Sequence, residues 1–152
     1  DAIPLLNGLI GRFPRNYLLR LELAQMYSDA GDKTNSFRTL AEVEELKRAG
    51  APGFERLPLE KILYFRANVQ FWYNDLDQAI ANFRRVTQKA EELDMNTGVL
   101  AWMRLGQTYD LKGRREEAVA AYRKAIAYAP ESSVAWESRG YLNSPYRRKA
   151  PA

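Results

Sequence analysis

The chain has 152 residues, of which 46% are hydrophobic and 28% are charged, and its formal net charge is +4. This composition predicts one domain with a continuous core, and the chain lacks the run of about eighteen apolar residues that a membrane-spanning helix requires. It also lacks cysteine and histidine, which excludes disulfides, thiolate nucleophiles, imidazole bases and the usual zinc ligands.

The first third of the chain predicts one helix followed by a complete helical hairpin. Residues 1–16 have apolar positions and a proline at the spacing of the second helix of a hairpin, so we interpret them as half of a repeat. Residues 17–57 predict the first complete hairpin, with its turn at Gly31-Asp32. Gly50, Pro52 and Gly53 indicate a loop after the second helix of that hairpin.

The middle segment, residues 58–98, predicts a second hairpin whose first helix is irregular. Apolar residues at helical spacing over 79–86 mark the second helix, which we expect to reach residue 92 or 93. In the first helix, Arg66 and Gln70 occupy positions where the contact between the two helices calls for apolar side chains. This hairpin is therefore expected to pack less regularly than its neighbours.

Residues 99–132 carry the most regular pattern in the chain. Trp102, Leu105, Gly106 and Tyr109 fall at positions i, i+3, i+4 and i+7, so they share one face of a helix. Glycine weakens a helix interior, and a second helix lying close against Gly106 would explain its presence. The positions that fit this second helix and its end are Ala118, Tyr122, Ala125 and Pro130.

These positions together resemble the tetratricopeptide repeat (TPR), whose W-x2-L-G-x2-Y pattern they reproduce. The resemblance implies an all-α fold: a right-handed TPR superhelix, or α-solenoid, of helix-turn-helix hairpins with about eight helices. Each hairpin has an apolar face that it cannot bury alone, so it depends on its neighbours.

The end of the chain predicts a capping helix and a tail. Trp136 and Gly140 repeat the aromatic and glycine positions of the preceding unit, so residues 133–143 are expected to form a terminal helix with Ser138 on its outer face. The TPR domain then covers residues 1–143, with repeats at 17–57, 58–98 and 99–132. We expect the basic tail, residues 144–152, to be disordered.

No group of residues has the spacing of a catalytic or metal site. Asp75 and Asp77 resemble the start of a calcium loop, but the glycine and the glutamate that such a loop requires are missing. The serines lie in loops or at helix ends without a histidine beside them, and no Gly-rich phosphate loop occurs. We therefore expect no enzymatic activity, no cofactor and no metal.

The TPR resemblance implies a non-catalytic protein–protein interaction module, part of a larger scaffold protein, that binds a peptide or partner segment in a concave groove. In this family the first helix of each hairpin lines the groove, and the second and third hairpins place apolar side chains there that we expect to be exposed. The partner-binding groove residues given by the resemblance are Lys61, Tyr64, Asn68, Phe71, Trp72, Leu100, Met103, Arg104 and Gln107. Alternatively, the aromatic run over 64–73 fills gaps that the irregular repeat lengths leave.

Nucleic-acid binding through the basic C-terminal third is the alternative function. Residues 99–152 carry ten basic and five acidic side chains. The aromatic run that could stack on bases lies in the middle third instead, which carries six basic and seven acidic side chains. We therefore expect a protein or peptide partner, with a second copy of the chain as a further candidate.

The sequence indicates no localisation, because a chain without cysteine suits reducing and oxidising compartments alike.

Overall fold

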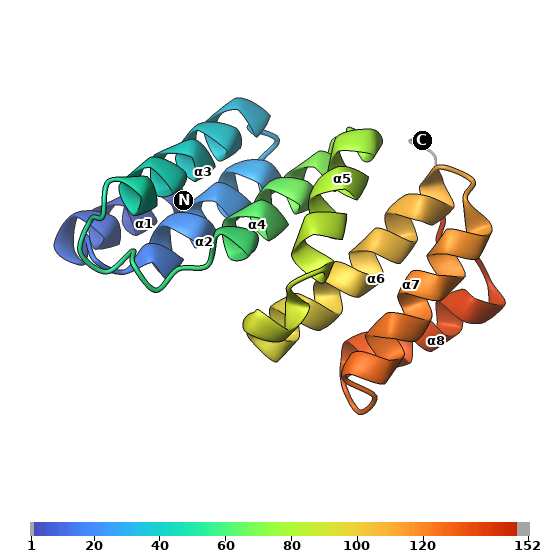
Figure 1. Cartoon of the computed structure of the whole chain (residues 1–152). Helices are drawn as coiled ribbons and strands as arrows, with labels where there is room; N and C mark the ends of the chain where they lie inside the picture. The colour runs from blue at the N-terminus through green and yellow to red at the C-terminus, as the bar shows by residue number, and fades with distance from the viewer. Residues whose placement is uncertain (1, 149–152) are drawn as a thin grey trace.

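The computed structural model describes residues 2–148, and within them every regular element is a helix (Figure 1). The helices are α1 (Ala2–Arg12), α2 (Tyr17–Asp29), α3 (Lys33–Arg48), α4 (Leu59–Trp72), α5 (Leu76–Thr87), the short 3-10 helix η1 (Ala90–Glu92), α6 (Met95–Leu111), α7 (Arg115–Tyr128) and α8 (Ser133–Asn143).

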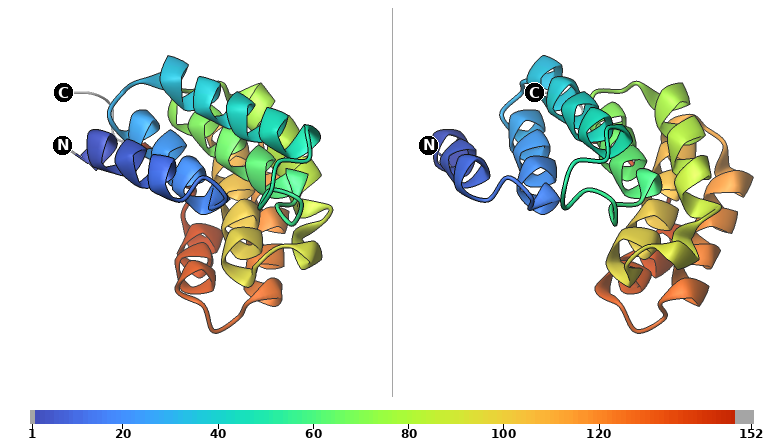
Figure 2. Two further views of the ribbon diagram at one scale, coloured as in Figure 1. Left: turned by 90° about the vertical axis from the view of Figure 1, so that its left-hand side faces the viewer. Right: turned by 60° about the vertical axis from the view of Figure 1, so that its left-hand side comes forward.

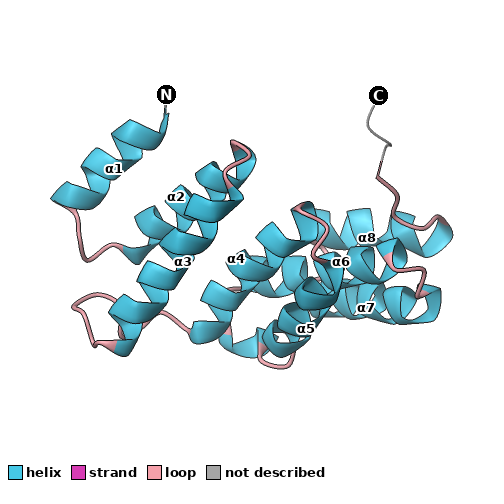
Figure 3. Cartoon of the chain, turned by 90° about the horizontal axis from the view of Figure 1, so that it is seen from above, coloured by secondary structure: helices cyan, strands magenta, loops and turns pink. Residues whose placement is uncertain are grey.

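Successive helices pair into three hairpins, α2 with α3, α4 with α5, and α6 with α7. The hairpins follow one another side by side, with α1 at one end of the row and α8 at the other (Figure 3). The first helices also contact one another along the row, α2 with α4, α4 with α6 and α6 with α8, and the row curves as it proceeds (Figure 2). This arrangement confirms the predicted all-α solenoid of helical hairpins.

The turn within each hairpin depends on one residue with a positive φ angle. Gly31 and Gly113 have φ values of 84° and 74° in the first and third hairpins, and Asn74 takes the equivalent place in the second with a φ of 63°. Glycine adopts this left-handed conformation without strain, and asparagine tolerates it better than most residues. The three hairpin turns therefore have a common backbone geometry.

The third hairpin buries its aromatic side chain over a glycine. Tyr122 of α7 is 0% exposed, and a Cβ atom added to Gly106 of α6 would lie 2.6 Å from Cε1 of that ring. The Tyr122 hydroxyl donates a hydrogen bond of 2.7 Å to Asp110 Oδ2. Burial, together with this hydrogen bond, raises the pKa of Tyr122 well above its ordinary value. The two helices approach closely because residue 106 has no side chain.

The middle hairpin differs from its predicted form at the end of its second helix, and its polar contact residue Gln70 is buried. The expectation that its second helix reaches residue 92 or 93 is wrong, because α5 ends at Thr87 and η1 follows. This break brings the Ala90 carbonyl to the Tyr128 hydroxyl of α7, which donates to it at 2.9 Å. The polar residue Gln70 is buried at the α4–α5 contact and accepts a hydrogen bond of 2.9 Å from Asn82.

The predictions for the C-terminal end need two corrections. Ser138 is 0% exposed and not on the outer face of α8, because α8 packs against both α6 and α7. The predicted disorder is wrong for residues 144–148, which lie against the helices. The Tyr146 backbone N–H donates to Asp110 Oδ2 at 3.0 Å, and its ring packs beside Phe71. The remainder of the predicted tail, 149–152, lies outside the described residues.

Candidate functional site

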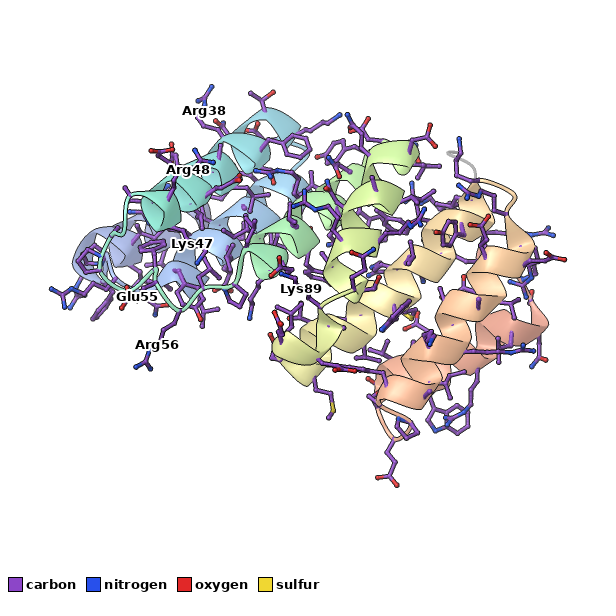
Figure 4. The ribbon with its side chains drawn as sticks, viewed as in Figure 1. Arg38, Lys47, Arg48, Glu55, Arg56 and Lys89 are labelled. Carbon is purple, nitrogen blue, oxygen red and sulfur yellow. The ribbon has the colours of Figure 1, made fainter. Side chains whose placement is uncertain are left out.

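The first helices of the hairpins line one face of the solenoid, and this face contains a hollow of about 420 Å³ between α2, α4 and the N-terminal part of α6. We call it the α2–α4–α6 hollow. Leu18 and Gln25 contribute from α2, Tyr64 and Asn68 from α4, and Leu100 from α6. On the outer helix α3, in contrast, Arg38 and Arg48 are exposed (Figure 4).

The apolar part of the hollow consists of leucine and aromatic side chains. Leu18 is 50% exposed, and Leu100 and Phe65 are half-buried. The Tyr64 ring stands edge-on to the Phe65 ring, with 5.5 Å between their centroids. Tyr64 itself is 8% exposed, and this burial raises the pKa of its hydroxyl. Leu18, Phe65 and Leu100 therefore form an accessible apolar wall beside the buried Tyr64.

The polar part of the hollow has one unsatisfied group. Asn68 donates through Nδ2 to Gln25 Oε1 at 3.4 Å, whereas its Oδ1 atom is buried and has no hydrogen-bond partner within residues 2–148. A buried acceptor without a donor carries a desolvation penalty of about 1–3 kcal/mol. The Asn68 amide is therefore only partly satisfied inside the chain.

Asp94 ties the edge of the hollow to the start of α6. Its Oδ2 accepts from the Thr97 backbone N–H at 3.0 Å, which caps the helix, and its Oδ1 accepts from Lys61 Nζ at 3.0 Å. Partial burial acts to raise the pKa of Asp94, but the hydrogen bonds from Lys61 and Thr97 together outweigh it and lower that pKa. The ionised carboxylate is therefore the form that the folded chain favours.

Replacing Asp94 by alanine is expected to lower the free energy of unfolding by about 1 kcal/mol at pH 7, since it removes the cap of α6. Because the folded state depresses the pKa, this contribution is present above the ordinary pKa of 3.8 and disappears as the pH falls through the folded-state value. Urea unfolding at pH 7 and in acid measures both effects. The control is Asp77→Ala, which removes a carboxylate that is 81% exposed and should change little. Equal losses in the two variants would contradict the role given to Asp94.

The structure brings only some of the sequence-predicted groove residues to the hollow. Lys61, Tyr64, Asn68 and Leu100 line it. The expectation of an exposed Met103 is wrong, because its side chain is 2% exposed within the core shared by α4 to α7. A methionine one turn further along α6 from Leu100 faces the neighbouring helices and not the hollow.

The other predicted residues lie towards the C-terminal ends of α4 and α6. Gln107 is 1% exposed and accepts a hydrogen bond of 2.7 Å from Arg104. The Arg104 guanidinium lies over the rings of Phe71 and Trp72, 5.3 and 5.2 Å from their centroids. Phe71 is 0% exposed and Trp72 is 45% exposed. Of these two predicted apolar groove residues, Trp72 is exposed as expected, whereas Phe71 is buried.

The predicted groove residues include none from α2 or from the N-terminus of α6, although both contribute to the hollow. Leu18 and Gln25 stand at the same repeat positions in the first hairpin as the predicted residues of the later hairpins, and that correspondence was the available signal. Asp94 and Thr97 lie before and within the first turn of α6. They reach the hollow because α6 starts at Met95. The sequence predicts a preceding helix that reaches residue 92 or 93, so it does not indicate this start.

Comparison with known proteins identifies one repeat by its sequence and a similar fold. A family model described as the tetratricopeptide repeat matches residues 99–132. The chain contains a tetratricopeptide repeat. A solved structure titled "Crystal structure of MamA" resembles this chain in fold with a TM-score of 0.57 and 21% sequence identity, over 93% of this chain and 79% of that chain. No curated protein matches the sequence.

The TPR match and the shared helical-repeat fold support a protein–protein interaction module. They lend no support to the nucleic-acid alternative. Within the basic C-terminal third, Arg114 pairs with Glu117 at 2.7 Å and Arg115 pairs with Asp110 at 3.0 Å, so two of its ten basic side chains are already engaged within the chain. None of the helices within residues 2–148 is long and apolar enough to cross a membrane.

Proposed function

We propose that the α2–α4–α6 hollow binds a segment of a partner protein, and that the chain serves as part of a larger scaffold. The observation that carries this proposal is the unpaired Oδ1 of Asn68 beside an accessible apolar wall. An extended segment has free backbone N–H groups, whereas the N–H groups within a helix are already bonded. Once the Asn68 amide turns its Oδ1 towards the hollow, this acceptor favours an extended partner segment.

The apolar wall supplies the anchor for such a segment. Leu18 stands on one side of the hollow and Leu100 on the other, with Phe65 between them. An apolar side chain of the partner would cover these surfaces and remove them from water, which stabilises the complex by about 25 cal/mol for each Å² buried. The Lys61–Asp94 pair at the edge would give the bound segment polar contacts that set its position.

A displayed library of short random segments tests this function. We expect selection on the whole chain to enrich segments with a large apolar anchor, and we expect Leu18→Asp to weaken their binding at least tenfold, since a charge in the anchor site must be desolvated. Leu5→Asp is the matched control, because Leu5 is a 69% exposed leucine on α1, outside the hollow. Binding that Leu18→Asp leaves unchanged, or that both variants weaken equally, would contradict the proposal.

A further inference from the structure

The segment 144–148 lies across the C-terminal ends of α4, α6 and α8, on the same series of first helices that forms the hollow. Tyr146 carries the contact in its centre. Its ring lies 5.9 Å from the Phe71 ring and 5.6 Å from the Tyr141 ring, centroid to centroid, and its backbone N–H donates to Asp110. We call Phe71, Trp72, Asp110 and Tyr141 the tail seat.

The tail seat presents a carboxylate that is already fixed in place. The Asp110 side chain is 1% exposed and accepts from Arg115 Nη1 at 3.0 Å, while Oδ2 also accepts from the Tyr122 hydroxyl. Arg115 in turn donates through Nη2 to the carbonyl oxygen of Tyr141 at 2.6 Å. Three helices therefore hold Asp110 in position, so the seat needs little ordering to accept a backbone N–H.

Arg148 occupies the aromatic part of the tail seat. Its guanidinium lies 4.3 Å from the Phe71 centroid and 5.3 Å from the Trp72 centroid, a geometry in which a cation is attracted to the ring faces. It also donates to the Phe71 carbonyl oxygen and to Asn74 Oδ1. The Phe71 carbonyl belongs to the last turn of α4, where the helix dipole favours a positive charge.

The same contacts limit how tightly the tail is held. Arg104 lies over the same two rings as Arg148, so two guanidinium groups are held near each other and repel. The Nε atoms of both arginines are buried without hydrogen-bond partners within the described residues, which costs free energy. Both effects weaken the hold of the seat on the tail.

We propose that residues 144–148 are a resident ligand of the groove, which a partner segment replaces by presenting an aromatic side chain followed two positions later by an arginine. Tyr146 and Arg148 show this spacing in the occupied seat. This inference rests on the proposed function. It adds which side chains the partner segment presents at the tail seat, apart from those that bind in the α2–α4–α6 hollow. The released tail would leave Phe71 uncovered for the incoming aromatic side chain.

Fluorescence of a label on the tail tests this proposal in the whole chain. The sequence has no cysteine, so Arg147→Cys gives one attachment point for a bimane dye at an exposed position. We expect Trp72 to quench the seated dye and Trp72→Phe to relieve that quenching. Adding Arg148→Ala should lower the ratio of seated to released tail by about tenfold, because it removes the cation–π contact. Leu18→Asp should leave the signal unchanged, which separates this test from that of the hollow.

The probe for displacement is the capped peptide Ser-Pro-Tyr-Arg-Arg. It should restore the fluorescence, whereas the same peptide with alanine in place of its tyrosine and last arginine should not. The proposal is overturned if Arg148→Ala leaves the quenching as it was, or if the two peptides act alike. Quenching that weakens on dilution of the protein would also overturn it, since the seat would then hold the tail of a second copy.

Discussion

Replacing Tyr122 by alanine is expected to lower the free energy of unfolding by about 3–5 kcal/mol, the range typical of large-to-small changes at an aromatic core position. The side chain is 0% exposed and fills the space above Gly106. Its ring also lies 5.3 Å from the Tyr141 ring of α8, centroid to centroid. Alanine would therefore leave a cavity where α6, α7 and α8 meet.

Urea unfolding of the whole chain measures this loss, and Tyr122→Phe is the matched control. Phenylalanine keeps the ring and removes only the hydroxyl that donates to Asp110, so about 1 kcal/mol should be lost. Asp110 retains its bonds to Arg115 and to the Tyr146 backbone. If the alanine and phenylalanine variants unfold at the same urea concentration, the ring does not contribute the packing described.

Replacing Gly106 by alanine is expected to destabilise the chain by about 1–3 kcal/mol, because the added Cβ overlaps the buried Tyr122 ring. The ring is enclosed on all sides and cannot move away cheaply. The same substitution at an unobstructed helix position normally stabilises, since alanine favours the helix more than glycine does. The sign of the effect therefore reports the close approach of α6 and α7.

Gly140→Ala provides that unobstructed position. Gly140 occupies the same repeat position in α8, and a Cβ atom there meets nothing within 4 Å. We expect a gain of about 0.5–1 kcal/mol from helix propensity alone. Thermal or urea unfolding of the two single variants makes the comparison, and effects of the same sign in both would contradict the packing assigned to Gly106.

The glycine pair shows how far the sequence could predict this fold. Gly106 and Gly140 fall at equivalent positions, and that periodicity is sufficient for the helices, the turns and the hairpin order. Periodicity cannot predict that alanine has opposite effects on stability at these two glycines. That difference depends on whether a side chain of another helix lies against the glycine, as Tyr122 does at Gly106. Periodicity describes one hairpin at a time, whereas packing depends on what the next hairpin contributes.

The candidate site was harder to predict for the same reason. Lys61, Tyr64, Asn68 and Leu100 line the hollow, since repeat positions fix which face of a first helix a residue occupies. Met103 did not follow this rule, because neighbouring helices cover it. The seating of Tyr146 on Asp110 joins residues 36 positions apart in the sequence, and no local pattern in a short basic tail indicates such a contact.

The most direct test of the protein-binding groove is a methyl NMR titration of the whole chain with a segment selected from the library. The account predicts that the methyl resonances of Leu18 and Leu100 shift and saturate together, because both line the hollow, while those of Leu5 stay in place. Saturating shifts at Leu5 with none at Leu18 and Leu100 would place the binding surface elsewhere and contradict the account.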